Sequence, residues 1–430
     1  MELTNGSPSL GMIHSYKCNC MKKEAISTDY QLPPLALLDE YIPESKVPED
    51  EITGWIETIR SILESGKVRV KDIKPVPGPA VTLYKVYPER KVKVSKVSSL
   101  LEDTALDLHL KGARVVTLKD SIGIEIANDH RAAVPIRSVL SEEAFRGSKA
   151  ELPVAIGRTF GDAVMVFDLT MAPHLLIAGA TKLGKTEAIH SIVASLLYSK
   201  LPSELKFVFI DPKGCEFPVY ERLCGHYLAS MPGEKPIVQT TAYADKTLAA
   251  LCEEMEIRYS FLSLAGISNI VEYNKRSSTP KGRWPYIVTI IDEYADLTIP
   301  LCRDMESRNM SHDITRSIIR LAQKGRAVGI HIILTTQRPS EAVITSLIKA
   351  NFPTRIAVRT MCETDSRIIL DSPGAESLIG SGDMIFQVGG EYTRLQGAYI
   401  SPEEIDRLTS YVESCPDSGS PYCLPTSFLK

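Results

Sequence analysis

The chain has 430 residues, of which 44% are hydrophobic and 24% charged, and its formal net charge is −4. This length favours two domains, and the composition is typical of a globular protein with a large buried core. The charge excludes a uniformly basic surface for nucleic acid, and the lack of a signal peptide and of an apolar run of roughly 20 residues favours a cytoplasmic chain without a membrane span.

Residues 1–32 contain glycine, serine and proline without periodicity, which predicts a flexible leader. Met1 and Met21 are both candidate starts of the chain. Nine cysteines, scattered and odd in number, indicate reduced thiols. Cys18 and Cys20 form one close pair, but zinc sites usually take two well-spaced pairs, so a metal site is disfavoured here.

Residues 33–150 predict a small α+β domain. The stretch "EDEITGWIETIRSILES" has helical spacing, with Ile52, Trp55, Ile56, Ile59 and Ile62 on one face. Strand-like runs follow it: "KVRVKDI", "AVTLYKVYP", "KVKVSKV" and "GIEIAND".

Residues 151–408 predict an α/β domain with a parallel sheet. Apolar strands alternate with long helices, and the strands lack polar alternation, as in a sheet covered on both faces. These strands are "PHLLIAG", "KFVFIDP", "YIVTIIDE", "GIHIILTTQ" and "RIAV". A ligand of such a domain binds at the carboxyl ends of the strands, and residues 409–430 are expected to form a short tail.

A phosphate-binding loop is predicted between the strand "HLLIA" and the helix "KTEAIHSIVASLLYS". Backbone amides at a helix N-terminus point at phosphates, aided by the helix dipole. Lys185 would pair with the β- and γ-phosphates of ATP, and Thr186 would bind Mg²⁺. The full loop comprises Gly179, Ala180, Thr181, Lys182, Leu183, Gly184, Lys185 and Thr186.

Polar residues end two further strands. In "YIVTIIDEYADL", Asp292 would hold Mg²⁺ through water, and Glu293 would polarise the attacking water. In "HIILTTQRPS", Gln337 would sense the γ-phosphate; its alternative is an exposed amide in a turn.

Together these blocks resemble the motor region of the FtsK/SpoIIIE family of double-stranded DNA translocases. The resemblance covers about residues 30–405 and includes "YQLPPLALLDEY", "PHLLIAGATKLGKT", "FVFIDPKGCEF" and "IRLAQKGRAVGIHIILTTQRPS". It implies a RecA-like P-loop NTPase core preceded by a smaller domain. It also implies a ring, usually a hexamer, that pumps double-stranded DNA through its centre.

The resemblance assigns further roles by position. Arg326 matches an arginine that reaches a neighbouring subunit's nucleotide, with Arg320 as the alternative. Arg338 and Lys349 match basic positions near the pore that would contact DNA phosphates, and "DPK" at residues 211–213 would support the nucleotide from behind.

Some positions depart from the family pattern. Lys182 and Leu183 replace small residues; the Lys182 charge would lie beside the phosphates or, as we expect, turn toward the ring neighbour. Glu363 replaces a basic residue, and Ser346 stands where glycine is common. These changes concern the grip on DNA and the path of the loop.

No transmembrane domain or C-terminal winged-helix domain is expected in this chain. We therefore predict an ATP-driven DNA translocase. The alternatives are a conjugation or secretion coupling ATPase of the same fold and a nucleotide-dependent DNA-binding module without efficient turnover.

Overall fold

The computed structural model describes residues 30–40, 47–105, 113–180, 183–277, 279, 282–299, 305–416 and 422–427. The candidate starts Met1 and Met21, the pair Cys18 and Cys20, and the loop residues Thr181 and Lys182 lie outside the described residues.

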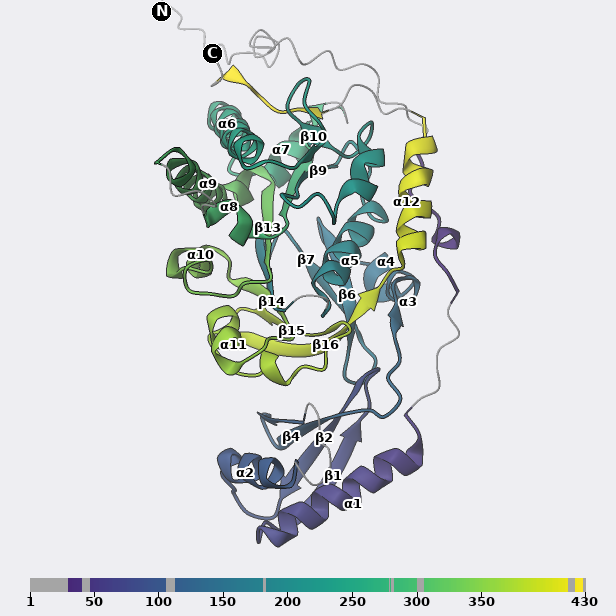
Figure 1. Ribbon diagram of the computed structural model, residues 1–430. Helices are drawn as coiled ribbons and strands as arrows, with labels where there is room; N and C mark the ends of the chain where they lie inside the picture. Colours follow the sequence, from purple (N-terminus) through teal and green to yellow (C-terminus); the bar gives the residue numbers. More distant parts are fainter. Residues whose placement is uncertain are drawn as a thin grey trace, which may run out of the picture.

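The small sheet near the N-terminus is antiparallel, in the order β1-β2-β4-β3 (Figure 1). The predicted helix forms over the residues expected, and Ile59, Ile62 and Leu63 bury its apolar face against the sheet. The elements are α1 (Glu49–Ser65), β1 (Val70–Val76), β2 (Val81–Pro88), α2 (Val94–Ala105), β3 (Arg114–Thr117) and β4 (Ile122–Ala127).

One strand prediction was wrong in this sheet. The run "KVKVSKV" does not pair with a neighbour; its second half begins helix α2 instead. Val97 and Leu101 are buried and lie four positions apart, so the helical period in the residues that follow outweighs the short lysine–valine alternation.

The largest sheet is mixed, with the strand order β11-β9-β12-β13-β8-β14-β15-β16-β6-β7 among the described residues. All five predicted strands are neighbours in its parallel half. Four antiparallel strands, which the sequence patterns did not indicate, extend the sheet beyond β14. The strands are β5 (Val134–Pro135, paired with β16), β6 (Pro153–Thr159), β7 (Val164–Asp168), β8 (His174–Ala178), β9 (Leu205–Ile210), β11 (Ile237–Val238), β12 (Tyr286–Ile291), β13 (Ile330–Thr336), β14 (Thr354–Val358), β15 (Asp383–Val388) and β16 (Glu391–Tyr399).

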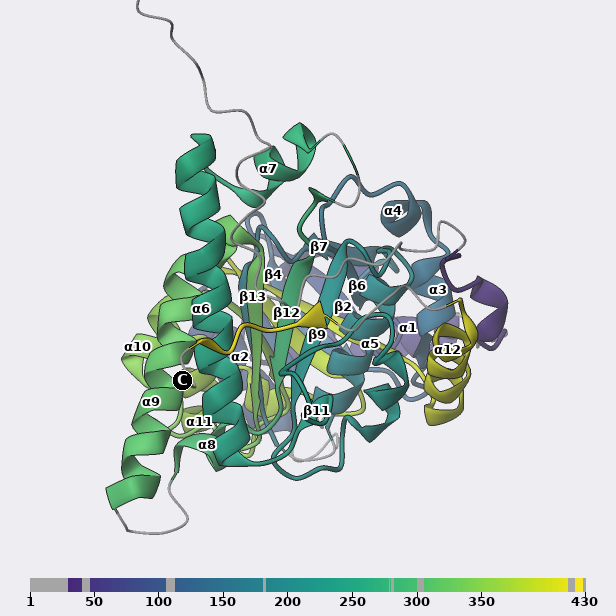
Figure 2. The same ribbon diagram turned by 90° about the horizontal axis from the view of Figure 1, so that it is seen from above.

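Helices cover both faces of this sheet, as the uniformly apolar strands require (Figure 2). One face is covered by α3 (Ile136–Leu140), α4 (Glu143–Arg146), α5 (Lys185–Leu197), η3 (Pro218–Leu223) and α12 (Pro402–Ser414), with η2 (Leu35–Leu37) beside α12. The other is covered by α6 (Thr241–Ala265), α8 (Tyr294–Thr298), α9 (Met305–Lys324), η5 (Gly325–Val328), α10 (Ser346–Asn351), α11 (Glu363–Leu370) and η6 (Ala375–Ser377). Helix α7 (Ile270–Arg276) packs at the edge, and β10 (Ala229–Ser230) pairs with β17 (Tyr422–Cys423) near the C-terminus. Among the described helices, none combines the length and the hydropathy that crossing a membrane requires.

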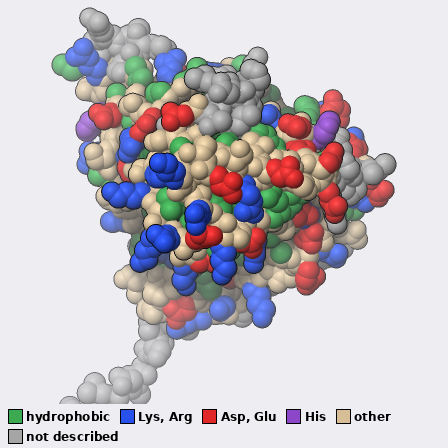
Figure 3. All heavy atoms as spheres, turned by 90° about the horizontal axis from the view of Figure 1, so that it is seen from below, with side chains coloured by type: hydrophobic (Ala, Val, Ile, Leu, Met, Phe, Trp, Pro, Cys, Tyr) green, Lys and Arg blue, Asp and Glu red, His purple; other side chains and the backbone are tan. Residues whose placement is uncertain are grey.

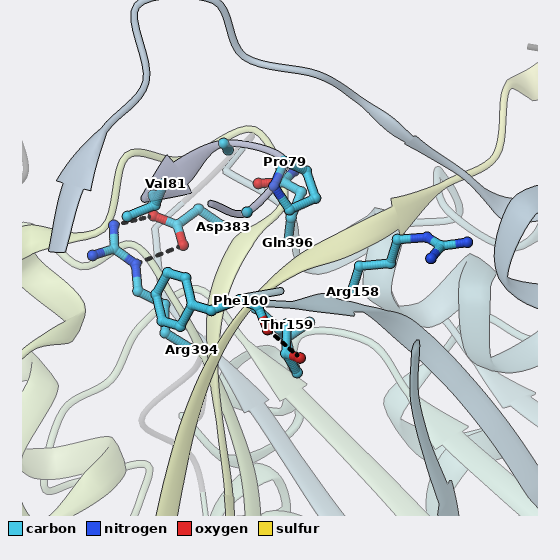
Figure 4. Close-up of a pocket in the computed structure, with 11 residues that line it drawn as sticks. Pro79, Val81, Arg158, Thr159, Phe160, Asp383, Arg394 and Gln396 are labelled. Carbon is cyan, nitrogen blue, oxygen red and sulfur yellow. Dashed lines mark hydrogen bonds and ion pairs between the residues drawn. The ribbon is translucent and has the colours of Figure 1, made fainter. Parts of the chain in front are cut away.

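A buried ion cluster joins the two sheets. Arg394 of β16 donates to both carboxylate oxygens of Asp383 at 3.0 and 2.7 Å, a fork drawn in Figure 4, and to Glu125 of β4 at 2.7 Å. All three side chains are at most 4% exposed. Asp383 also accepts from the amide of Ile379, so the cluster holds the turn before β15. That turn packs against the phosphate loop, because a Cβ on Gly184 would lie 3.1 Å from Gly382.

Candidate nucleotide-binding site

The described residues of the predicted phosphate loop connect the carboxyl end of β8 to the first turn of α5. Gly179 has a φ of +148°, and a Cβ there would lie 2.6 Å from the carbonyl oxygen of Val358, so only glycine fits. The amide of Ala180 donates to the carbonyl of Arg359 at 2.8 Å, which fixes the loop against the neighbouring strand. Helix α5 therefore presents its N-terminal amides where the loop ends.

Lys185 lies in a buried polar network. Its ammonium donates to Asp292 at 2.5 Å and to the hydroxyl of Thr335 at 3.4 Å, and Thr335 donates to the same Asp292 oxygen at 2.8 Å. Lys185 is 3% exposed and Asp292 1%. The structure thus brings together the ends of β8, β12 and β13, and the lysine and the aspartate expected to handle phosphate and Mg²⁺ are in direct contact.

Glu293 is held in one orientation by its neighbours. It adopts a left-handed backbone conformation with φ of +43° at the start of α8. Its carboxylate accepts from the hydroxyl of Thr336 at 2.8 Å and from the amide of Gln337 at 3.1 Å. A strained, buried carboxylate at a strand end is typical of a functional position. Gln337 thus contributes its backbone amide to the orientation of Glu293.

The loop after β9 forms the next wall of the site. Asp211 accepts from the amides of Gly214, Glu216 and Phe217 at 2.8 to 3.0 Å, so it fixes the shape of the loop from within. Lys213 extends over the site, 3.6 Å from Glu293 and 3.5 Å from Asp296.

Glu216 is a site residue that the sequence analysis missed. Burial and then the Asp292 carboxylate raise its pKa above the ordinary value, while the Thr186 hydroxyl, which bonds to it, acts in the opposite direction. Thr186, Asp292 and Glu216 thus bring oxygen donors to one place, and carboxylate and hydroxyl oxygens are the ligands Mg²⁺ prefers. The residues present fit a nucleotide–Mg²⁺ complex. The sequence feature that could have indicated Glu216 is its position three residues after "DPK".

Arg326 lies at the opposite edge of the sheet from this site. It is exposed in η5, before β13 begins, and contacts the sulfur of Met171 at 3.5 Å. The alternative, Arg320, is paired with Glu256 at 2.9 Å.

A buried arginine braces the turn that carries Arg326. Arg258 of α6 donates to the carbonyls of Val328 at 2.8 Å and Pro285 at 2.9 Å, and to Glu254 at 2.8 Å. The next residue, Tyr259, donates to the carbonyl of Lys324 at 2.8 Å. The hydroxyl of Tyr422 in β17 accepts from Arg258 at 3.1 Å and donates to Glu254 at 2.6 Å, so the C-terminal strand joins the same network.

The two predicted DNA contacts differ in availability. Arg338 is exposed two residues after the end of β13, next to Gln337, whose amide bonds to Glu293. Lys349 of α10 is 23% exposed and forms an ion pair with Asp371, which Arg355 also contacts at 2.6 Å. Burial acts to raise the pKa of Asp371, but Lys349 and Arg355 outweigh it and lower that pKa. A phosphate would have to compete with Asp371 for Lys349.

Two family models match the chain. The FtsK alpha domain model matches residues 32–128, and the FtsK/SpoIIIE family model matches residues 135–341. The chain is 40% identical over 404 residues to the DNA translocase SftA of Bacillus subtilis, covering 91% of this chain and 40% of that protein. It is 39% identical over 427 residues to the DNA translocase FtsK of Haemophilus influenzae, covering 92% of this chain and 77% of that protein. It spans about half the length of other curated relatives, such as 49% of FtsK of Chlorobaculum tepidum.

Solved structures share the fold. The pCW3 conjugation coupling protein TcpA, in its monomer form with ATPγS, has a TM-score of 0.58 at 23% identity, covering 83% of this chain and 98% of that one. The cytoplasmic domain of the type VII secretion ATPase EccC of Thermomonospora curvata has a TM-score of 0.54 at 24% identity, covering 64% of this chain and 32% of that one. These likenesses and the family models confirm the predicted α/β P-loop core preceded by a smaller α+β domain.

Proposed function

The chain belongs to the FtsK/SpoIIIE family and carries its P-loop ATPase domain, and we propose that it is an ATP-driven translocase of double-stranded DNA. The observation that supports this most is the convergence of Lys185, Asp292 and Glu293 with the start of α5 at one edge of the large sheet. A motor that acts on duplex DNA would work in the cytoplasm, where its DNA substrate and ATP are found.

Each residue of the site has a role that its contacts suggest. Lys185 would exchange its bond to Asp292 for the β- and γ-phosphates, and the amides from Gly179 to Thr186 would cradle them. Thr186 and Asp292 would hold Mg²⁺, which when bound neutralises charge on the phosphates. Glu293, oriented by Thr336 and Gln337, would accept a proton from the attacking water. Gln337 would pass the loss of the γ-phosphate on to the adjacent Arg338.

A ring, which we take to be hexameric, would complete this site. Arg326 lies at the amino end of β13, whereas the phosphate loop of its own subunit follows the carboxyl end of β8, so its guanidinium would act on the nucleotide of a neighbour. Hydrolysis would then require assembly. Arg338 and Lys349 would contact DNA phosphates in the central pore without reading bases.

We also propose that residues 33–150 and 151–408 form two domains, between a leader of residues 1–32 and a tail of residues 409–430. Strand β5 and helices α3 and α4 of the first range pack against the large sheet and would form the hinge between the two.

The test is ATP turnover with and without linear duplex DNA, combined with displacement of a triplex-forming strand. We expect duplex DNA to stimulate turnover and ATP to drive displacement. Turnover that is indifferent to DNA would refute the proposal. A preference for single strands in competition would instead favour the coupling ATPase, and ATP binding without turnover would favour the binding module.

A further inference from the structure

The small domain carries a dense group of positive charges that the nucleotide site does not use. Between residues 67 and 96 the chain has nine lysines and arginines against two acids, in a protein whose net charge is −4. Eight of these cations are exposed. We call them the basic face: Lys67, Arg69, Lys71, Lys74, Arg90, Lys91, Lys93 and Lys96.

The fold gathers these residues from two segments. Val70 at the start of β1 pairs with Pro88 at the end of β2, and the amide of Glu89 donates to the carbonyl of Arg69 at 3.0 Å. The segment before β1 therefore lies beside the connection from β2 to α2. Val68 and Val70 point into the core, so Lys67, Arg69 and Lys71 alternate outward.

Few acids within the described residues balance the basic face. Lys74 is the single member with an ion pair to another described residue, a 4.0 Å contact with Asp72 in which both side chains are at least half exposed. Like charges held close together repel one another and oppose folding. A group of them without internal partners therefore indicates an anionic partner outside the chain.

The basic face and the nucleotide site belong to different domains. The small domain forms one end of the molecule, below the large sheet in Figure 1. Seen from that end, blue lysine and arginine side chains gather over one side of the surface and red acidic ones toward the other (Figure 3). Charges separated in this way form a local field that the net charge conceals.

We infer that the basic face binds the phosphate backbone of duplex DNA, at a contact separate from Arg338 and Lys349. This inference rests on the proposed function, which supplies DNA as the partner. None of the large exposed hydrophobic side chains in the described part of the chain lies between residues 67 and 96. Membrane-surface helices and protein interfaces combine charge with exposed apolar or aromatic groups. A surface of lysines and arginines alone matches phosphates, which need cations but no base reading.

The test is the salt dependence of duplex DNA binding by the full chain with a non-hydrolysable ATP analogue. The variant is Lys91→Gln, Lys93→Gln and Lys96→Gln combined, because these side chains are exposed and form no ion pair to a described residue. Each phosphate contact contributes about −0.9 to the slope of log K against log salt. The triple variant should therefore bind DNA with a slope smaller by between about 2 and 3.

The matched control neutralises three exposed lysines of the large domain: Lys235, Lys246 and Lys275. It should leave the slope unchanged, and both variants should keep their DNA-independent ATP turnover. An equal slope in wild type and triple variant, or an equal loss in the control, would overturn the inference. So would binding of the basic face to phosphatidylglycerol vesicles with no effect on DNA. If wild-type protein bound no duplex at all, the proposed function itself would fail.

Discussion

Replacing Arg394 by methionine should destabilise the protein by about 3–5 kcal/mol, the range for breaking a buried ion pair by removing one partner. Arg394 is 1% exposed and donates to Asp383 twice and to Glu125 once, at 2.7 to 3.0 Å. Burial acts to lower the pKa of its guanidinium, but the two carboxylates outweigh this and raise it. Without the arginine, Asp383 and Glu125 would be left as buried carboxylates of like charge, although Arg114 lies 3.8 Å from Glu125.

The matched control is Arg367→Met. Arg367 contacts Glu363 at a similar distance, 2.7 Å, but both side chains are more than half exposed, so the loss should be below about 0.5 kcal/mol. The assay is urea unfolding at pH 7, comparing the free energy of the first transition for both variants. If Arg394→Met costs no more than Arg367→Met, burial does not strengthen this cluster and the reasoning is refuted.

Four further predictions concern the site and its surroundings. Lys185→Ala should abolish ATP binding, measured by titration with a fluorescent ATP analogue; unchanged affinity would show that the lysine does not hold phosphate. Glu293→Gln should keep ATP binding and lower turnover at least about 100-fold, because it removes the base but keeps an acceptor for the Thr336 hydroxyl. Phosphate release at saturating ATP measures turnover. Near-normal turnover would exclude Glu293 as the base. The Arg326→Ala protein should bind ATP without turnover. Mixing it with the Glu293→Gln protein should restore some activity, because some subunit interfaces of the mixed rings then combine an intact Glu293 with an intact Arg326. An active Arg326→Ala protein would exclude the action of Arg326 on a neighbour's nucleotide. Burial lowers the pKa of His174 to about 3 and that of His331 to about 4, so between these values and about 6.5 the unfolded chain binds more protons than the folded one. The free energy of unfolding should therefore fall by about 2 kcal/mol per histidine from pH 7 to pH 5. A urea midpoint that does not change with pH in that window would contradict this, and His312→Gln, at an exposed histidine, should leave the profile unchanged.

The core of the fold and of the site could be predicted because its signals are local. A strand, a loop with fixed glycines and a helix follow one another in the chain, and parallel strands bring their carboxyl ends to one edge. Lys185, Asp292 and Glu293 were found in this way: Lys185 follows the loop after β8, and Asp292 and Glu293 follow the end of β12. Thr335 and Thr336 end β13 and were equally visible, but nothing local indicates which acid a threonine will contact.

Long-range pairing could not be predicted. Glu125 and Arg394 are 269 residues apart, and neither position differs in pattern from a surface residue of its strand. The antiparallel strands after β14 alternate less clearly than the buried parallel ones, so their place in the sheet depends on partners distant in sequence. The failed strand at "KVKVSKV" shows the same limit, because seven residues fit two periods and packing decided between them.

If Arg326 contacts a neighbouring subunit as proposed, the hydrogen bonds that hold its turn lower the entropic cost of that contact. Tyr259 and Arg258 hold the carbonyls of Lys324 and Val328, one on each side of Arg326, so the backbone there has lost its freedom on folding. An arginine mounted in this way gives up only its side-chain rotamers on contact, at most about 2 kcal/mol. Because the hydroxyl of Tyr422 accepts from the same Arg258, the C-terminal strand helps to set how rigidly Arg326 is presented.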